Sequence, residues 1–453
     1  MPNTAFLKWI DSRRKAVSVD IEQIPFSRLS KWYFDPGTGN LRHESGRFFS
    51  IEGIQVKTNW GLVPSWSQPI IDQPEIGFLG IIAKEFNGVL YFLMQAKIEP
   101  GNINFVQLSP ALQATKSNYS KVHKGKTPNY LEYFNGEKKV TVLLDQLQSE
   151  QGARFLKKRN RNMIVEVHED IPVYDDFCWL TLGQIKKLMH IDNLVNMDTR
   201  TVISGIGFGT YPVESIDLFR QFVSARPASE GQRLLLSALD DRHSLSTIEE
   251  IISWITRLKS KYDLEVSRIP LNKVCNWTRT DDEIHHVDHK YFSVIGANVN
   301  ISNREVINWS QPLVRSAQEG LIAFIIKNIN GVAHFLVQAK IEAGNFDILE
   351  LAPTVQCLTG NYRKGQNEYE VPFIREVLDC PIEKILYKTM QSEEGGRFYK
   401  EQNLNMIIEA GDDFPEEVPE NFHWMTLNQL YGFIRYNNYL NIQARSLLAA
   451  VAF

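Results

Sequence analysis

The sequence lacks long apolar runs and has little cysteine, and each absence excludes a class of protein. No window reaches the roughly 18 uninterrupted apolar residues of a membrane-spanning helix. Near the N-terminus, Lys8, Asp11 and Arg13 interrupt any apolar core of the signal-peptide kind. The four cysteines show no Cys-x-x-Cys spacing, which is typical of a reducing compartment and argues against a structural zinc site. We therefore expect a cytoplasmic protein.

Charge of one sign is also scarce. The formal net charge of the 453-residue chain is -4, which provides no overall attraction for nucleic acid or anionic lipid. Hydrophobic residues make up 43% and charged residues 23%, values ordinary for a folded chain, and the length predicts two or more domains. We expect neither a nucleic-acid partner nor a membrane.

The strongest signal in the sequence is a long internal repeat. The stretch FLMQAKIEPGN from Phe92 returns as FLVQAKIEAGN from Phe335. The segment from Trp66 to Pro69 recurs from Trp309 to Pro312, and in both cases the offset between the copies is 243 residues. Because this period is far longer than a solenoid unit, it indicates a duplicated domain.

Matches between the two copies define the domain boundaries. They run from about Phe6 to Ser204 and from about Ile251 to Ala449. We predict a first domain over residues 1–206, a connection over residues 207–249 and a second domain over residues 250–453.

The hydrophobic period changes along each copy. Phe6 to Arg14 has helical spacing. Shorter runs over Phe48 to Ile54, Gly77 to Lys84 and Val89 to Glu99 predict strands. Asn87-Gly88 between two of them predicts a type I′ hairpin, whose central residues both need positive φ.

The late part of each copy predicts helices. Val140 to Arg159 and Leu180 to Met189 both have helical spacing. The expected fold class is α+β, with mixed or antiparallel sheets flanked by helices in two tandem copies.

One strand carries a row of polar side chains. Alternation places Gln95, Lys97 and Glu99 on one face of the strand from Val89. Such a row can line a cleft, with lysine facing a carbonyl or anionic oxygen and glutamate moving a proton. A solvated face with a cross-strand ion pair is the alternative. The second copy repeats the row as Gln338, Lys340 and Glu342.

The loop after this strand can hold an anion. Backbone N-H groups and polar side chains could bind a diphosphate there, although a plain surface turn has the same composition. Farther on, His123 is a usable acid or base or simply an exposed histidine. The loop residues are Thr115, Lys116, Ser117, Asn118 and Tyr119, and their echo in the second copy includes Asn361, Tyr362 and Arg363.

Tryptophans recur at equivalent positions in the two copies. Most are expected to be core residues, but one that faces a cleft can stack on a nucleobase. We expect Trp32 to do so, with Trp277 as its counterpart. Neither a P-loop nor a dinucleotide-binding fingerprint is present, which disfavours nucleoside-triphosphate and nicotinamide chemistry.

Several long stretches resemble the NDP-hexose 2,3-dehydratase family. They are GRFFSIEG from Gly46, WSQPIIDQPEIG from Trp66, LMQAKIEPGN from Leu93, QATKSNYSKVH from Gln113 and LQSEQGARF from Leu147. The resemblance implies tandem Nudix-like domains, each with a nucleotide-sugar pocket, in a homodimer. Neither copy has the Nudix motif whose glutamates hold magnesium, and no metal is expected.

The resemblance also implies a reaction. The substrate would be a nucleoside-diphosphate 4-keto-6-deoxyhexose, with dTDP-4-keto-6-deoxyglucose as the expected form. It would lose the C2 hydroxyl and give a 3,4-diketo-2,6-dideoxy sugar. No external cofactor is needed because the substrate's ketone is the electron sink. A downstream 3-ketoreductase would consume the unstable product. The alternatives are a diverged Nudix diphosphatase and a non-catalytic nucleotide-sugar binding protein.

These implications assign roles to residues of this chain. Glu99 or His123 is the expected base, and Lys97 steadies the C4 oxygen. Further substrate contacts in the first pocket are expected from Trp32, Trp66, Gln95, Thr115, Lys116, Ser117, Asn118, Tyr119 and Arg154. The second pocket would bind through Trp277, Trp309, Gln338, Lys340, Glu342, Asn361, Tyr362, Arg363 and Arg397.

Overall fold

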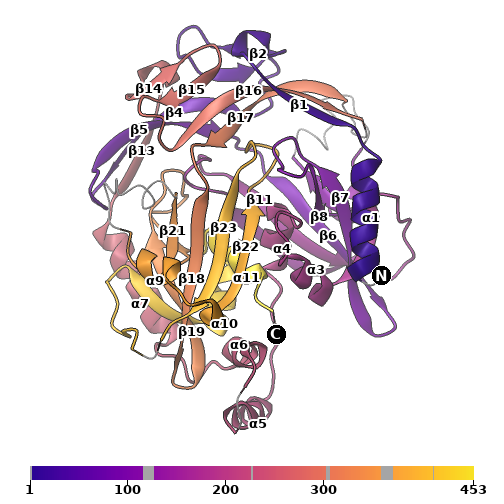
Figure 1. Ribbon diagram of the computed structural model, residues 1–453, viewed down its shortest axis with the longest axis vertical. Coiled ribbons are helices and arrows are strands. Elements are labelled where there is room, and N and C mark those ends of the chain that lie inside the picture. The colour runs from indigo at the N-terminus through magenta and orange to yellow at the C-terminus, as the bar shows by residue number, and fades with distance from the viewer. Residues whose placement is uncertain are drawn as a thin grey trace.

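In the computed structural model, each half of the chain contributes one large mixed sheet and one smaller antiparallel sheet (Figure 1). Helices flank these sheets, so the predicted α+β fold class is confirmed. Among the described residues, no helix is both long enough and apolar enough to cross a membrane. The structure describes residues 3–115, 127–225, 228–302, 307–358, 371–411 and 413–452.

The large sheet of the first half has the strand order β10-β11-β6-β7-β12, with β8 beside β7 and β9 beside β6. β11 runs parallel to β6, and the other pairs are antiparallel. The strands are β6 (Gly77–Phe86), β7 (Val89–Ile98), β8 (Val106–Pro110), β9 (Leu112–Ala114), β10 (Thr141–Ser149), β11 (Arg159–Glu166) and β12 (Phe177–Thr181).

The second half repeats this sheet with the order β22-β23-β18-β19-β24, and with β20 beside β19 and β21 beside β18. Again one pair, β18 with β23, is parallel. The strands are β18 (Gly320–Ile329), β19 (Val332–Lys340), β20 (Glu350–Ala352), β21 (Val355–Leu358), β22 (Ile385–Ser392), β23 (Gln402–Glu409) and β24 (Phe422–Thr426).

The two small sheets exchange a strand between the halves. β1 (Val19–Ile24) pairs along its whole length with β16 (Phe292–Ile301) of the second half. β13 (Leu264–Ile269) pairs with β4 (Ser50–Thr58) of the first half. Each small sheet, at the top of Figure 1, is therefore completed by the other half. Their remaining strands are β2 (Trp32–Phe34), β3 (Leu41–His43), β5 (Ser65–Asp72), β14 (Trp277–Arg279), β15 (Glu283–His286) and β17 (Asn308–Ser316).

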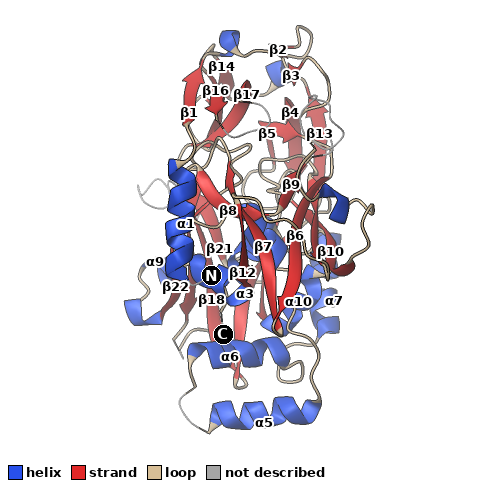
Figure 2. Ribbon diagram, turned by 90° about the vertical axis from the view of Figure 1, so that its right-hand side faces the viewer, coloured by secondary structure: helices blue, strands red, loops and turns tan. Residues whose placement is uncertain are grey.

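Helices cover the large sheets and join the halves (Figures 1 and 2). α4 packs against α11 at the centre, where the two halves meet. α5 and α6, in the connection, lie at the end opposite the small sheets. The helices are α1 (Asn3–Lys15), α3 (Leu182–Leu188), α4 (Met197–Ile203), α5 (Val213–Ser224), α6 (Glu230–Leu239), α7 (Ile248–Lys261), α9 (Ile374–Leu378), α10 (Leu427–Ile434) and α11 (Ile442–Ala449).

Two fully buried arginines hold the centre together. Arg200 on α4 donates 2.7 Å hydrogen bonds to Gln391 Oε1 and to the Ser392 carbonyl of the second half. Arg445 on α11 donates to the carbonyl of Ser149 in the first half. Because a buried charge that loses its partners costs several kcal/mol, these contacts fix how the halves meet.

Local sequence explains the predicted elements that are confirmed. In α1, Phe6 and Ile10 are buried one turn apart, and three basic residues in the last turn favour the negative end of the helix dipole. Asn87 and Gly88 have φ values of 52° and 78° between β6 and β7, as a type I′ turn requires. The hairpin prediction is therefore confirmed.

The helix predicted over Val140 to Arg159 is wrong. This segment contains the edge strand β10, which pairs with β11. A register shift between Val142 and Leu144 breaks the alternation of the strand, and a bulge of this kind moves apolar residues off every second position. The apparent helical spacing arose from this bulge. Of the segment from Leu180 to Met189, the later part is helical, as α3.

Candidate active site

A cavity of about 460 Å³ lies between the large sheet of the first half and the two small sheets. Both halves line it, because the small sheets are shared and a loop of the second half reaches across. The residues that could contact a ligand chemically include Trp32, His43, Gln73, Lys97, Glu99, Gln113, Thr115, Glu150, Lys158, Asp198, Trp309, Gln311, Glu394 and Arg397.

The polar row on β7 forms one wall of the cavity. Lys97 Nζ donates to the carbonyl oxygen of Gln113 at 3.0 Å. Gln113 Nε2 donates to Glu99 Oε1 at 2.5 Å, and Gln113 Oε1 accepts from Asn196 Nδ2 at 3.3 Å. Glu99 is 3% exposed, and its Oε2 has no hydrogen-bond partner in the described part of the chain. Gln113 thus holds the lysine beside a carboxylate that keeps one oxygen for a ligand.

The predicted division of this strand into two faces is confirmed. Met94, Ala96 and Ile98 pack into the main hydrophobic core, so the polar row occupies the opposite face. The alternative of a solvated face does not apply at Glu99, which is buried. Gln95 lies on the polar face but outside the cavity lining.

Three further carboxyl groups surround Glu99. They belong to Asp198 in the first turn of α4, Glu150 after β10, and Glu394 from the second half. Asp198 is 2% exposed, and its Oδ1 has no hydrogen-bond partner among the described residues. Burial raises the pKa of Asp198 well above its usual value, and the neighbouring carboxylates of Glu99 and Glu394 raise it further. Burial also raises the pKa of Glu394 to about 8, so the cluster retains protons at neutral pH.

Two cations face these carboxyl groups. Arg397 reaches the cavity from the second half, and its Nε donates to Gln73 Oε1 at 3.2 Å. Its guanidinium carbon lies 4.2 Å from the centroid of the Phe49 ring, a cation–π distance. Burial lowers the pKa of Lys158 to about 8. Both side chains can contact an anionic group of a ligand.

Two indole rings also line the cavity. Trp32 on β2 donates from Nε1 to the Ser310 carbonyl at 3.0 Å, which ties β2 to β17. It also packs against Phe49 with ring centroids 4.9 Å apart. Trp309 on β17 donates from Nε1 to Gln311 Oε1 at 2.8 Å. Aromatic rings fixed in this way can stack on a planar ligand group.

The assignment of Arg154 and Trp66 to the pocket of Lys97 is wrong. The residues that line this cavity are their counterparts from the other copy, Arg397 and Trp309. Arg154 lies instead within electrostatic range of three carboxylates of the second half. Trp66 packs against a hydrophobic cluster that includes Ala343 of the second half.

Reciprocal loop contacts cause this exchange. Gly101 N donates to the Gly395 carbonyl at 2.7 Å, and Gly344 N donates to the Gly152 carbonyl at 2.6 Å. A Cβ added at Gly101 would lie 1.6 Å from the carbonyl oxygen of Phe398, so only glycine permits the approach. The loop that carries Arg154 therefore lies over the large sheet of the second half, and the loop that carries Arg397 lies over that of the first half. The internal repeat of the sequence does not reveal this exchange.

The second half contains the same hydrogen-bonded row. Lys340 Nζ donates to the Gln356 carbonyl at 3.2 Å, and Gln356 Nε2 donates to Glu342 Oε1 at 3.0 Å. Asn441 Nδ2 donates to Gln356 Oε1 at 2.8 Å. Arg154 is the arginine near Glu342. Trp277 packs against Phe292 in the adjacent small sheet, with ring centroids 4.7 Å apart.

The charged groups around the two rows differ. Asp198 and Gln443 occupy the same position, two residues after the asparagines that cap α4 and α11. In the same way, the Glu394 of the first site corresponds to Gln151, which lies beside Glu393 in the second. The first site thus has carboxyl groups where the second has amides.

Some predicted site residues lie outside the described part of the chain. Thr115 lines the cavity and is the last described residue before residues 116–126. The residues concerned are Lys116, Ser117, Asn118, Tyr119 and His123 in the first copy and Asn361, Tyr362 and Arg363 in the second.

Sequence reasoning missed Asp198, Glu394 and Lys158. The sequence did contain a signal for Asp198, because the repeated segment reads NMDTR from Asn196 and NIQAR from Asn441. A carboxyl group in one copy and an amide in the other marks a position where the two sites diverged. For Glu394, the crossing of the loops had to be known first, and Lys158 has no lysine counterpart in the repeat that would have marked it.

A family model described as NDP-hexose 2,3-dehydratase matches residues 3–206 and again residues 248–451. The two matches confirm the predicted duplication.

Three curated relatives carry the name dTDP-4-dehydro-6-deoxy-α-D-glucopyranose 2,3-dehydratase. The protein of Saccharopolyspora spinosa is 49% identical over 456 residues, covering 100% of this chain and 91% of the relative. That of Amycolatopsis orientalis is 45% identical, covering 98% and 88%. That of Streptomyces violaceoruber is 43% identical, covering 98% and 96%.

These matches extend over nearly the full length of this chain and of each relative. They confirm the resemblance found in the sequence and the hydro-lyase class it implied. The chain belongs to the NDP-hexose 2,3-dehydratase family.

Proposed function

We propose that this protein removes water from dTDP-4-keto-6-deoxyglucose in the cavity of the first half, giving the dTDP-3,4-diketo-2,6-dideoxy sugar. The substrate follows from the names of the relatives. The observation that carries the assignment to this cavity is the meeting of Lys97, Glu99 and Asp198 within it. A cation, a carboxylate and a protonated acid are the groups that such an elimination needs.

The elimination begins at C3, whose proton is acidified by the C4 ketone. Glu99 removes this proton through Oε2, and Lys97 stabilises the negative charge that develops on the C4 oxygen. The C4 carbonyl then re-forms as the C2–O bond breaks, and Asp198 supplies the proton with which the hydroxyl leaves as water. The resulting C2–C3 enol takes up a proton at C2, loses the proton of its C3 hydroxyl and becomes the C3 ketone.

The two carboxyl groups suit opposite roles because their surroundings differ. Glu99 Oε1 accepts a hydrogen bond from Gln113, and Glu99 Oε2 has no hydrogen-bond partner among the described residues, so Oε2 is available to take the proton. Asp198 is buried with a pKa well above its usual value, which favours the protonated acid. His123 remains the alternative base.

Arg397 and Lys158 would bind the diphosphate, together with Thr115 and residues 116–119. Arginine and lysine form charge-assisted hydrogen bonds to phosphate oxygens. Trp32 would stack on the thymine base.

The second site would bind a nucleotide sugar without reacting. Lys340 and Glu342 are held there as in the first site. Gln443 in place of Asp198 cannot protonate a leaving hydroxyl, since an amide is not an acid at neutral pH.

Incubation of the purified protein with dTDP-4-keto-6-deoxyglucose, without added metal or nicotinamide, tests the function. Mass spectrometry should detect loss of one water, or free dTDP as the diketo sugar decomposes. Intact substrate would support a binding protein instead. Release of dTMP and sugar phosphate only with magnesium would support a diphosphatase.

Three further proposals concern the setting of the reaction. The described free thiols fit a cytoplasmic protein. A 3-ketoreductase would consume the diketone, because such a product decomposes if it accumulates; adding one should yield a stable reduced sugar. The chain would act as a homodimer, which light scattering of the purified protein would test.

A further inference from the structure

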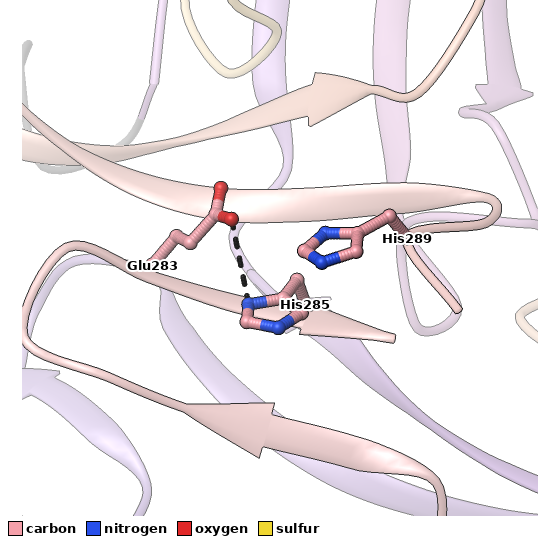
Figure 3. A group of neighbouring side chains, drawn as sticks. All are labelled: Glu283, His285 and His289. Atoms are coloured by element: carbon pink, nitrogen blue, oxygen red, sulfur yellow. Dashed lines mark ion pairs between the residues drawn. The ribbon is translucent and has the colours of Figure 1, made fainter. Parts of the chain in front are cut away.

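Three metal-ligating side chains lie together on the small sheet of the second half. Glu283 and His285 lie on β15, and His289 lies in the turn that follows; Figure 3 shows them side by side. One ligand atom from each lies within 4.8 Å of the other two. Two imidazoles and one carboxylate are a common ligand set for zinc and related divalent ions.

The polar atoms of this cluster are arranged as a ligand set would be. His285 Nδ1 lies 3.4 Å from Glu283 Oε1 and has no hydrogen-bond partner in the described residues. The other carboxylate oxygen, Oε2, accepts from Arg315 Nη2 at 2.5 Å. A ligating carboxylate is commonly oriented by such an outer hydrogen bond. The rings of His285 and His289 stack with centroids 4.4 Å apart.

The backbone at His289 points to the same role. Its φ is 53°, in the left-handed region that glycine adopts most easily. The equivalent residue of the first half is Gly46, whose φ is 64°. Both turns close with the same hydrogen bond, to the carbonyl of His286 or of His43. A bulky residue in the conformation that the first copy fills with glycine carries a backbone cost, which a ligand role would offset.

The other two positions differ between the copies as well. Arg42 stands where His285 does, since each faces the residue after the tryptophan on the neighbouring strand. It forms an ion pair with Glu52 at 3.1 Å. Asn40 stands in place of Glu283 and accepts from the backbone of Leu271. In the first copy, Arg42 and Asn40 thus make structural contacts and the third position is glycine, whereas the second copy has side chains able to bind a metal at all three positions.

We propose that Glu283, His285 and His289 bind one divalent transition metal ion of the zinc type, with water at the remaining coordination position. The ion would link β15 to its following turn. On the opposite face of β15, His286 contacts Trp277 at a centroid distance of 5.7 Å, so the ion would also stiffen the edge that carries this tryptophan. This proposal departs from the sequence-based expectation of no metal, which depended on the missing Nudix motif and the scattered cysteines.

Metal titration of the full-length protein tests the site. After treatment with EDTA and dialysis, Zn²⁺ binding is measured by calorimetry and Co²⁺ binding by visible absorption. We expect about one ion per chain. His289→Gly, which restores the residue of the first copy, should weaken binding at least about tenfold. Zinc should raise the melting temperature of the wild type but not of this variant.

Two control variants make the result specific. His286→Gln changes a neighbouring histidine on the other face of β15 and should keep the ion. Cys275→Ser removes an exposed thiol that could bind zinc by itself, and it too should keep the ion. Equal binding by the wild type and His289→Gly, or loss of binding in Cys275→Ser, would overturn the proposal.

Discussion

The two polar rows on β7 and β19 are built alike, while the groups around them are not. In each, a glutamine main chain accepts from the lysine and its side chain donates to the glutamate, with donor–acceptor distances between 2.5 and 3.2 Å. Around the first row lie Asp198 and Glu394, and the equivalent residues around the second are amides. Both copies therefore retain the hydrogen-bonded row, and they have diverged in the acidic groups around it.

The largest effect is expected from Asp198→Asn, which makes the first site resemble the second. Loss of an acid at the leaving hydroxyl should lower kcat roughly 100- to 10,000-fold, measured as the rate of water loss by mass spectrometry. The matched control, Gln443→Asn, should leave kcat within about twofold. A fall in kcat in the control alone would move the chemistry to the second site.

Lys97→Met removes the cation expected at the C4 oxygen. We expect kcat to fall roughly 100- to 1,000-fold, the usual effect of losing one group that stabilises an oxyanion. Lys340→Met makes the same change in the second row and should leave turnover intact. Unchanged turnover in Lys97→Met would exclude the proposed role of this lysine.

The crossed loops predict which arginine serves the reacting site. Arg397→Gln should raise KM roughly 10- to 100-fold, because a charged hydrogen bond to the diphosphate is lost. Arg154→Gln should leave the KM for turnover unchanged, although Arg154 belongs to the same half of the chain as Lys97. Melting curves of both variants check that they fold. The reverse pattern would mean that each half binds its substrate with its own arginine.

The smallest effect is a shift in pH dependence. Asp198 must be protonated to act as the acid, so kcat/KM should fall as pH rises through its raised pKa. Glu394→Gln copies the second site and removes a negative charge near Asp198, which lowers the pKa of Asp198. The alkaline limb of the profile should therefore move to lower pH. An unchanged alkaline limb would mean that the charge of Glu394 does not affect the pKa of the proton donor.

The raised pKa of Glu394 also affects the free energy of unfolding. Between about pH 4.5 and 8 the folded state keeps a proton on Glu394 that the unfolded chain releases. The free energy of unfolding should therefore decrease as pH rises through this range. Urea unfolding of the wild type and Glu394→Gln, compared at pH 5.5 and 8, would measure this contribution.

Local pattern was enough to predict much of the fold. The Asn87-Gly88 turn, the first helix and the two faces of β7 follow from short-range periodicity, which depends only on neighbouring residues. The strand β10 was mistaken for a helix because a bulge near Val142 disrupts its alternation. Lys97 and Glu99 could be selected because one strand presents both. Arg397 and Trp309 were selected for the second pocket instead, since they reach the cavity of Lys97 through an exchange between distant segments.

The exchanged strands β1 and β13 also bear on how the molecule unfolds. If either half lost its order, the small sheet of the other would lose an edge strand, and the backbone groups of that edge would be exposed. Neither repeat is then an independent folding unit, although each has a large sheet of its own. The duplication has produced a chain whose two similar parts share one cooperative transition, much as two subunits of a strand-swapped dimer would if they were joined by a tether.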